Sequence, residues 1–194
     1  MVTRLARAFV AVVPPPAGLD AIEAVLREVE VPSALRWVPR DQWHLTMRFL
    51  GRVHDLDAVI TQLDAAFAAH TDPLPPVRLG GGGTFPSLRH AAVVWVGVAA
   101  GQDGLVRLAR VLGSGGGDDP VPGLVGDEPD RRRYRPHLTL ARPRGQVDVH
   151  GLVDALNAAP TGPEWTPTEA VLFESLPARD GVTHVERARF NLPG

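Results

Sequence analysis

The sequence predicts an α+β fold of two similar lobes. Three observations support this prediction. Helical and alternating apolar segments are mixed along the 194 residues, and short turns join neighbouring strands as in antiparallel hairpins. One series of elements, a strand followed by a helix and two strands, occurs twice, which indicates an internal duplication. These features are typical of antiparallel sheets that carry helices on one face. The length suits one domain, which we expect to cover residues 1–194.

The chain begins with an apolar run at 7–13, which we interpret as a buried strand. The run is too short for a signal peptide and ends in consecutive prolines. A helix is predicted at 17–30, where apolar residues recur at helical spacing. A short extended segment at 35–39 leads to a strand at 43–50. Asp55 is the predicted N-cap of the next helix, which covers 56–69.

The strand at 43–50 alternates regularly, so its side chains divide between two faces. Four large apolar residues are expected on one face: Trp43, Leu45, Met47 and Phe49. Three polar residues are expected on the other: His44, Thr46 and Arg48.

The remaining elements follow the same reasoning. Strands are predicted at 76–80, 91–98, 137–142, 166–175 and 182–191. Helices are predicted at 102–112 and 148–158, and a hairpin turn at 178–181. The segment 113–130 is rich in Gly, Pro and Asp and is expected to form a flexible surface loop. It ends in the densest positive charge of the chain, the arginine cluster 131–135.

Composition excludes several classes of function. The chain has no Cys, which excludes a disulfide scaffold, a thiol nucleophile, an iron–sulfur cluster and a Cys-ligated zinc. Its net charge is −2, so any nucleic-acid contact must be local, and all 20 basic residues are Arg. The glycine run 80–83 lacks the Gly-Lys-Ser/Thr ending of a phosphate-binding loop and is interpreted as a bulged turn. No apolar run is long enough to span a membrane, and we expect a cytoplasmic protein.

Two copies of one tripeptide point to the chemistry. His44-Leu45-Thr46 and His137-Leu138-Thr139 stand at matching points of the repeat. In a strand, each copy presents an imidazole and a hydroxyl on one face, because residues two apart lie side by side. Two histidines in one pocket can divide the work of acid and base near neutral pH. The Thr hydroxyls can donate hydrogen bonds to phosphate oxygens without adding a positive charge.

A zinc site is the alternative use of these histidines, but no third ligand at suitable spacing accompanies either copy. A lone histidine on a strand is usually structural. We assign the other five histidines to structural or solvent-exposed positions: His54, His70, His90, His150 and His184.

With these motifs, the sequence resembles the two-histidine phosphoesterase superfamily, whose signature is a duplicated His-x-Thr/Ser-x motif (HxTx). Within it, the chain is similar to the RNA 2′,3′-cyclic phosphodiesterases, formerly called 2′-5′ RNA ligases (LigT-like, ThpR). The resemblance spans nearly the whole chain. The segments that match the family are 7–12, 36–39, 43–51, 82–86, 94–98, 135–142 and 185–190.

The resemblance implies a bilobal fold with a V-shaped cleft between two antiparallel sheets, and a reaction that needs no metal or other cofactor. The family opens a terminal RNA 2′,3′-cyclic phosphate to a 2′-phosphomonoester. By motif, His44 is the general acid that protonates the leaving 3′ oxygen, and His137 is the general base that activates water. Thr46 and Thr139 hold phosphate oxygens, and Arg142 contacts the phosphate. Strict alternation would turn Arg142 away from His137, so the strand must end or bulge there, or Arg142 must wrap round the edge.

The resemblance also suggests a role for the arginine cluster. It is either a solvated loop end or a contact for the RNA backbone, with Tyr134 available to stack on a base. The expected partner is RNA ending in a 2′,3′-cyclic phosphate, or a small cyclic nucleotide, bound by a monomer without membrane association. The alternatives are a small-nucleotide cyclic phosphodiesterase, 2′-5′ RNA ligase activity at the same site, and a non-catalytic RNA-binding module.

Overall fold

The computed structural model describes residues 5–114, 134–159, 162–179 and 181–193. They contain one eight-stranded sheet in which all paired strands are antiparallel. The strands are β1 (Ala6–Val12), β2 (Leu35–Trp37), β3 (Leu45–Val53), β4 (Arg78–Phe85), β5 (Val93–Ala100), β6 (Leu138–Pro143), β7 (Glu169–Ala178) and β8 (Gly181–Asn191). The helices are α1 (Pro16–Arg27), α2 (Leu56–Ala69), α3 (Gln102–Val111) and α4 (His150–Ala158).

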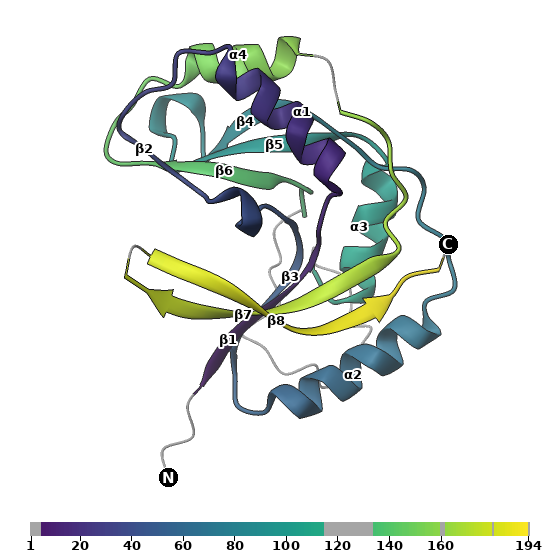
Figure 1. Ribbon diagram of the computed structural model, residues 1–194. Helices are drawn as coiled ribbons and strands as arrows, with labels where there is room; N and C mark the ends of the chain where they lie inside the picture. Colours follow the sequence, from purple (N-terminus) through teal and green to yellow (C-terminus); the bar gives the residue numbers. More distant parts are fainter. Residues whose placement is uncertain (1–4, 115–133, 160–161, 180, 194) are drawn as a thin grey trace.

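The sheet runs in the order β4-β5-β6-β3-β1-β7-β8, with β2 paired to β6. It divides into two halves at β6 and β3, which share only the pairing of Leu45 with Leu138. Figure 1 shows the two halves diverging from this junction, with α1 and α4 over the upper half and α2 under the lower one. The α+β class and the two lobes with outer helices are therefore confirmed.

The two repeats exchange their hairpins, so neither lobe is built from one repeat alone. The strand, helix and hairpin of the first repeat are β3, α2 and β4–β5, and those of the second are β6, α4 and β7–β8. However, β5 pairs with β6, and β7 joins β3 through β1. Each lobe thus combines the motif strand of one repeat with the hairpin of the other, and the motif strands meet at the centre.

Most elements lie close to the predicted positions. Asp55 caps α2 as expected, since its side chain accepts a hydrogen bond from the Ala58 N–H at 3.0 Å. Helix α1 ends at Arg27 rather than at residue 30, and its end is tightened by the Glu28 N–H, which donates to the Val25 carbonyl oxygen at 3.1 Å. No helix in the described ranges is long and apolar enough to cross a membrane.

The glycine run 80–83 is part of strand β4 rather than a turn before Phe85. A register shift between Leu79 and Gly82 places a bulge inside the strand, where Gly81 has a φ of +76°. Gly83 lies against the indole of Trp95, and a Cβ at this position would overlap the ring. The glycine at this position therefore allows the backbone to lie close to the Trp95 side chain.

Each motif strand carries a bulge at the fourth residue of its motif. In β3, Thr46 pairs with Ala11 and Arg48 with Val10, so that Met47 is the extra residue. In β6, Thr139 pairs with Trp95 and Ala141 with Val94, so that Leu140 is the extra residue. A bulge resets the alternation of side chains. Of the alternatives expected near Arg142, the structure shows the bulge.

The bulge in β3 corrects the predicted faces of that strand. Arg48 does not share the face of Thr46; it is buried in the core, where its guanidinium donates to the Leu112 carbonyl oxygen. Phe49 does not join Leu45 and Met47 in the core; it pairs with Phe9 on the opposite face and is 70% exposed. Strict alternation failed here because the extra residue Met47 moves Arg48 and Phe49 to the opposite faces, and a second register shift at Leu50 changes the alternation again.

We expect Gly83→Ala to lower the free energy of unfolding by about 1–3 kcal/mol, the usual effect of overpacking. The physical reason is the overlap between the new methyl group and the Trp95 ring. Gly151→Ala is the matched control, because its Cβ would meet nothing within 4 Å and Ala favours the helix. Thermal denaturation should show a lower midpoint for Gly83→Ala alone. Equal midpoints for Gly83→Ala and the unmodified protein would contradict the packing described.

Candidate active site

The first motif begins immediately before β3 and holds its imidazole at both nitrogens. The Nδ1 of His44 lies 2.7 Å from the Gln42 carbonyl oxygen, an acceptor only, so Nδ1 carries a proton. Its Nε2 lies 3.1 Å from the Thr46 hydroxyl oxygen. In the neutral ring, Nε2 is therefore the basic nitrogen and accepts a hydrogen bond from Thr46.

The second motif repeats this arrangement before β6. The Nδ1 of His137 donates to the Arg135 carbonyl oxygen at 2.7 Å, again two residues earlier in the chain. The Nε2 of His137 is thereby the nitrogen available for proton exchange. Both motifs thus fix the same tautomer by the same local contact.

The pairing of Leu45 with Leu138 brings the two motifs together. The histidine and threonine of each motif therefore flank this single pair. The two imidazoles are close enough to influence each other, since the charge of His137 lowers the pKa of His44. Both leucines are fully buried and anchor the opposite face of the sheet.

Aromatic rings hold each imidazole in place. His44 stacks on Phe9 with ring centroids 4.7 Å apart, and Phe9 in turn stacks on Phe173 at 5.4 Å. His137 meets the edge of Phe85 at 4.9 Å. These contacts restrict the rings and remove water from part of their surface.

Removal from water lowers the pKa of both histidines. Burial is the main cause of a His44 pKa of about 4, opposed by the hydrogen bond to Gln42 and assisted by the charges of His184 and His137. Burial also lowers the pKa of His137, and the positive charges of Arg135 and Arg142 act in the same direction. Both rings are therefore neutral near pH 7 in the empty site.

The arginines near His137 differ in their placement. The bulge in β6 turns Arg142 to the face of Thr139, and there its charge acts on His137. Arg135 lies over the Trp95 ring, with its guanidinium carbon 4.5 Å from the ring centroid. The predicted contacts of Arg131, Arg132 and Arg133 fall outside the described residues.

Two expectations about the neighbouring loop can be compared with the structure. Tyr134 is half-buried against the core, and its hydroxyl donates to the Thr46 carbonyl oxygen at 2.7 Å, so its ring is held away from the role of stacking on a base. Ser114, near the start of the predicted loop, is also buried and donates to the Met47 carbonyl oxygen at 2.8 Å. Residues 115–130 of that loop lie outside the described ranges.

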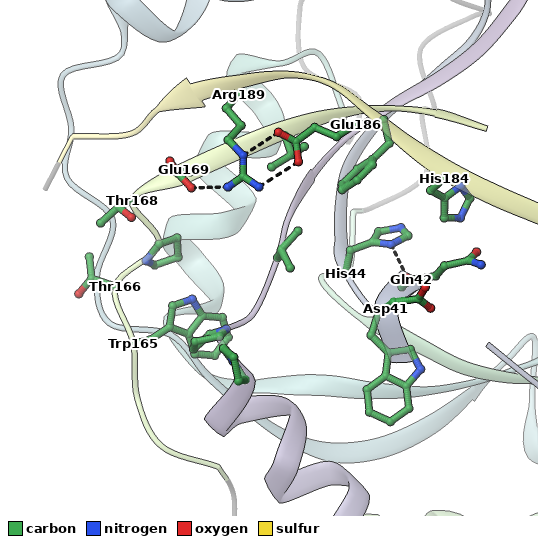
Figure 2. A pocket seen from close by; sticks show the side chains of 17 residues that line it. Asp41, Gln42, His44, Trp165, Thr166, Thr168, Glu169, His184, Glu186 and Arg189 are labelled. Carbon is green, nitrogen blue, oxygen red and sulfur yellow. Dashed lines mark hydrogen bonds and ion pairs between the residues drawn. The ribbon is translucent and has the colours of Figure 1, made fainter. Parts of the chain in front are cut away.

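A pocket of about 660 Å³ opens beside His44 and extends toward the start of β7. Figure 2 shows His44 and His184 close together and Arg189 on another wall of the pocket. There Arg189 forms ion pairs with Glu169 at 2.7 Å and Glu186 at 2.6 Å. The pocket lining includes neither His137 nor Thr139, so this space adjoins the first motif only.

His184 was not expected in the site. Its ring meets His44 edge-on at 5.4 Å and Phe9 at 4.8 Å, and its Nδ1 lies 3.3 Å from the Ser175 hydroxyl. Only the pairing of β7 with both β1 and β8 brings this late strand beside the first motif, and no local pattern in the sequence signals it. In the described part of the chain, no group of three or more His, Cys, Asp or Glu side chains could hold a metal ion.

Comparison with known proteins identifies the family. A model of the 2′-5′ RNA ligase superfamily matches residues 12–178, and the chain belongs to this superfamily. It is 30% identical to a protein named RNA 2′,3′-cyclic phosphodiesterase from Aeropyrum pernix, over 63% of this chain and 65% of that protein. It therefore spans just under two thirds of that relative's length.

Two further similarities cover more of the chain. A protein from Aquifex aeolicus with the same name is 23% identical over 72% of this chain and 71% of its own length. The crystal structure of E. coli LigT complexed with NADP+ is 26% identical and covers 98% of this chain and 99% of that chain, with a TM-score of 0.70. The fold is thus shared along nearly the whole of both chains.

We expect His44 to titrate near pH 4 in the unliganded protein, well below the ordinary histidine pKa of about 6.5. Since the folded-state pKa is lowered, protonation favours the unfolded state, and stability is lost as the pH falls from about 6.5 toward 4. NMR titration of the ring protons measures the pKa, and nitrogen shifts report the Nδ1–H tautomer. The variant His44→Gln, which removes the titrating group, should lose less stability over this range. A His44 pKa at or above 6.5 would contradict the environment described.

Proposed function

We propose that this protein hydrolyses the terminal 2′,3′-cyclic phosphate of RNA to a 2′-phosphomonoester, with His44 as general acid and His137 as general base. The observation that carries the proposal is the pairing of Leu45 with Leu138, which sets two imidazoles of the same tautomer on one face of the sheet. Two relatives bear the name RNA 2′,3′-cyclic phosphodiesterase, which supports this choice of substrate.

The reaction takes one proton from water and gives one to the leaving group. The Nε2 of His137 accepts a proton from water as the water oxygen forms a bond to phosphorus. The bond between phosphorus and the 3′ oxygen breaks, and the Nε2 of His44 donates its proton to that oxygen. The product carries a 2′-phosphate and a 3′-hydroxyl. Proton exchange with solvent restores a neutral His137 and a protonated His44 for the next cycle.

The charges around His137 support its assignment as the base. Arg135 and Arg142 disfavour a positive charge on His137, which suits a base that must start neutral. His44 must start protonated, and the negative charge of a bound cyclic phosphate raises its pKa. Arg142 and the hydroxyls of Thr46 and Thr139 then hold the non-bridging phosphate oxygens. In this step, a phosphate oxygen replaces His44 as the acceptor of the Thr46 hydroxyl.

The pocket beside His44 suits the remainder of the terminal nucleotide. The acid must lie next to the 3′ oxygen, so the ribose that carries this oxygen lies on the His44 side. A volume of about 660 Å³ falls within the usual range for small-molecule sites. The base of the terminal nucleotide would enter this pocket.

The variants His44→Ala and His137→Ala should each lower kcat by about 10²–10⁴-fold, the usual contribution of a general acid or base. The double variant should lose less than the product of the two effects, because the histidines act as a unit. Steady-state kinetics on RNA ending in a 2′,3′-cyclic phosphate measures these losses, and chromatography identifies the phosphomonoester. The matched control His150→Ala removes an exposed imidazole outside the site. Near-normal kcat in either folded active-site variant would reject the mechanism.

Treatment with EDTA should leave kcat unchanged. We propose that the histidines transfer protons rather than bind a metal, so a chelator removes nothing that the reaction requires. Elemental analysis of the purified protein is the companion measurement. A stoichiometric metal whose removal abolishes turnover, and whose return restores it, would show that the motif histidines are ligands.

A further inference from the structure

We propose that the cleft face of β1 and β3 binds the single-stranded body of the RNA substrate, with one base on Phe49 and one backbone phosphate between Arg7 and Arg52. This inference rests on the proposed function and names the surface that would distinguish RNA from a cyclic mononucleotide. The surface consists of three successive pairs across the two strands: Arg7 with Arg52, Phe9 with Phe49, and Ala11 with Thr46.

The register of β1 and β3 places these pairs on one face. Directly opposed residues of an antiparallel pair share a face, and so do residues two apart in β1. Phe9 is on the side of the site, because it stacks on His44. The three pairs therefore form a continuous surface that leads from Thr46 of the first motif to Arg7 and Arg52 at the end of the strands.

Phe49 has the exposure and position of a base-stacking residue. It is 70% exposed, while its neighbour Phe9, 6.0 Å away, is buried and supports it from the side. The bulge at Met47 is what turns Phe49 to this face, as the bulge at Leu140 turns Arg142. Phe49 and Arg142 both stand five residues after their motif histidine, so the repeat places them at equivalent positions beside the reacting phosphate.

The arginine pair supplies the charge that selects an anionic partner. Arg7 and Arg52 are exposed and directly opposed, an arrangement in which like charges repel. Within the described residues, neither guanidinium has an ion pair with a carboxylate. A phosphate between them would relieve the repulsion and accept hydrogen bonds from both.

The spacing along β3 suits a single-stranded nucleic acid. The partners of Thr46, Phe49 and Arg52 in β1 stand two residues apart, because Met47 and Leu50 are extra residues of β3, so successive pairs lie roughly 7 Å apart at about 3.3 Å per residue. Along this surface, a phosphate contact at Thr46, the ring of Phe49 and a second phosphate contact at Arg7 and Arg52 follow one another. Their spacing is similar to that of neighbouring nucleotides. An exposed ring between cationic residues binds single strands with little sequence preference, because every base has a face on which to stack.

The direction of the surface agrees with the proposed position of the terminal nucleotide. The base leaves the ribose at C1′, and the RNA chain continues from C5′, on the other side of the ring. The pocket beside His44 extends toward Pro15 and the start of β7, whereas Arg7 lies at the opposite end of β1. The terminal base and the RNA body would therefore leave the cyclic phosphate in different directions.

The test compares kcat/KM for an RNA hexanucleotide ending in a 2′,3′-cyclic phosphate with kcat/KM for 2′,3′-cyclic AMP. Phe49→Ala should lower the ratio of the two values by about 5- to 150-fold, the usual effect of losing one stacked base. Phe49→Trp should restore the ratio, because it replaces the ring. Arg7→Gln and Arg52→Gln should lower the ratio and flatten the dependence of log KM for the hexanucleotide on log salt by about 0.7 per lost contact.

Arg110→Gln is the matched control, since it removes one positive charge from the exposed side of α3 and should leave the ratio unchanged. An unchanged ratio in Phe49→Ala, or an equal fall on both substrates, would overturn the proposed surface. So would a failure of Phe49→Trp to restore the ratio.

Equilibrium binding separates this inference from the proposed function. Fluorescence anisotropy with a labelled hexanucleotide ending in a 2′-phosphate requires no turnover, and Phe49→Ala should weaken this binding as well. If the unmodified protein cleaves neither cyclic substrate but the Phe49 and Arg7 variants still weaken RNA binding, the proposed function is overturned and the surface is supported. If it cleaves both substrates and no variant changes RNA binding, only the surface is overturned.

Discussion

The site depends on one backbone pairing, that of Leu45 with Leu138. These are the middle residues of the two motifs, and their fully buried side chains fill the core on the opposite side of the sheet from the imidazoles. Because the described strands β3 and β6 share this one pairing, they diverge on either side of it. The motif residues are thus close at the junction, while the sheet on either side opens into two surfaces. A longer ladder between β3 and β6 would hold the motifs together equally well but would close the space in front of them.

The second constraint is the bulge that follows each motif. One extra residue, Met47 or Leu140, enters the core and shifts the residues after it. On the active-site face, the motif histidine and threonine then lie before the bulge, and one further residue lies beyond it. In the second repeat the further residue is Arg142, and in the first it is Phe49. Duplication has thus supplied the same backbone device twice, and the side chains at its end differ in chemistry.

The sequence predicted the fold class, the helices and the two motifs, because these depend on local periodicity and on a repeated tripeptide. It could not predict features that depend on pairing between distant segments. Phe49 was assigned to the core because alternation contains no sign of a bulge, and His184 was judged structural because β8 lies 140 residues after His44. Tyr134 was expected at the surface among arginines, yet it is half-buried against the core and its hydroxyl donates to the Thr46 carbonyl oxygen. Arg142 is the exception. The phosphate contact that the family resemblance implies for it conflicts with strict alternation, and this conflict indicated an irregularity such as a bulge.

The two histidines are alike in tautomer but unlike in electrostatic environment, and this difference arises outside the motifs. His137 has Arg135 and Arg142 nearby, whereas the charges that lower the pKa of His44 are those of other imidazoles, His184 and His137. The arginines remain charged at every working pH, so they disfavour protonation of His137 permanently. An imidazole repels a proton on its neighbour only when it is itself charged, so near neutral pH this effect on His44 disappears. Burial opposes a positive charge on both rings, and its effect on His44 is large enough to set a pKa of about 4. In the proposed mechanism, His44 therefore becomes the acid only when the negative charge of the bound phosphate raises this pKa, while the arginines help to keep His137 neutral.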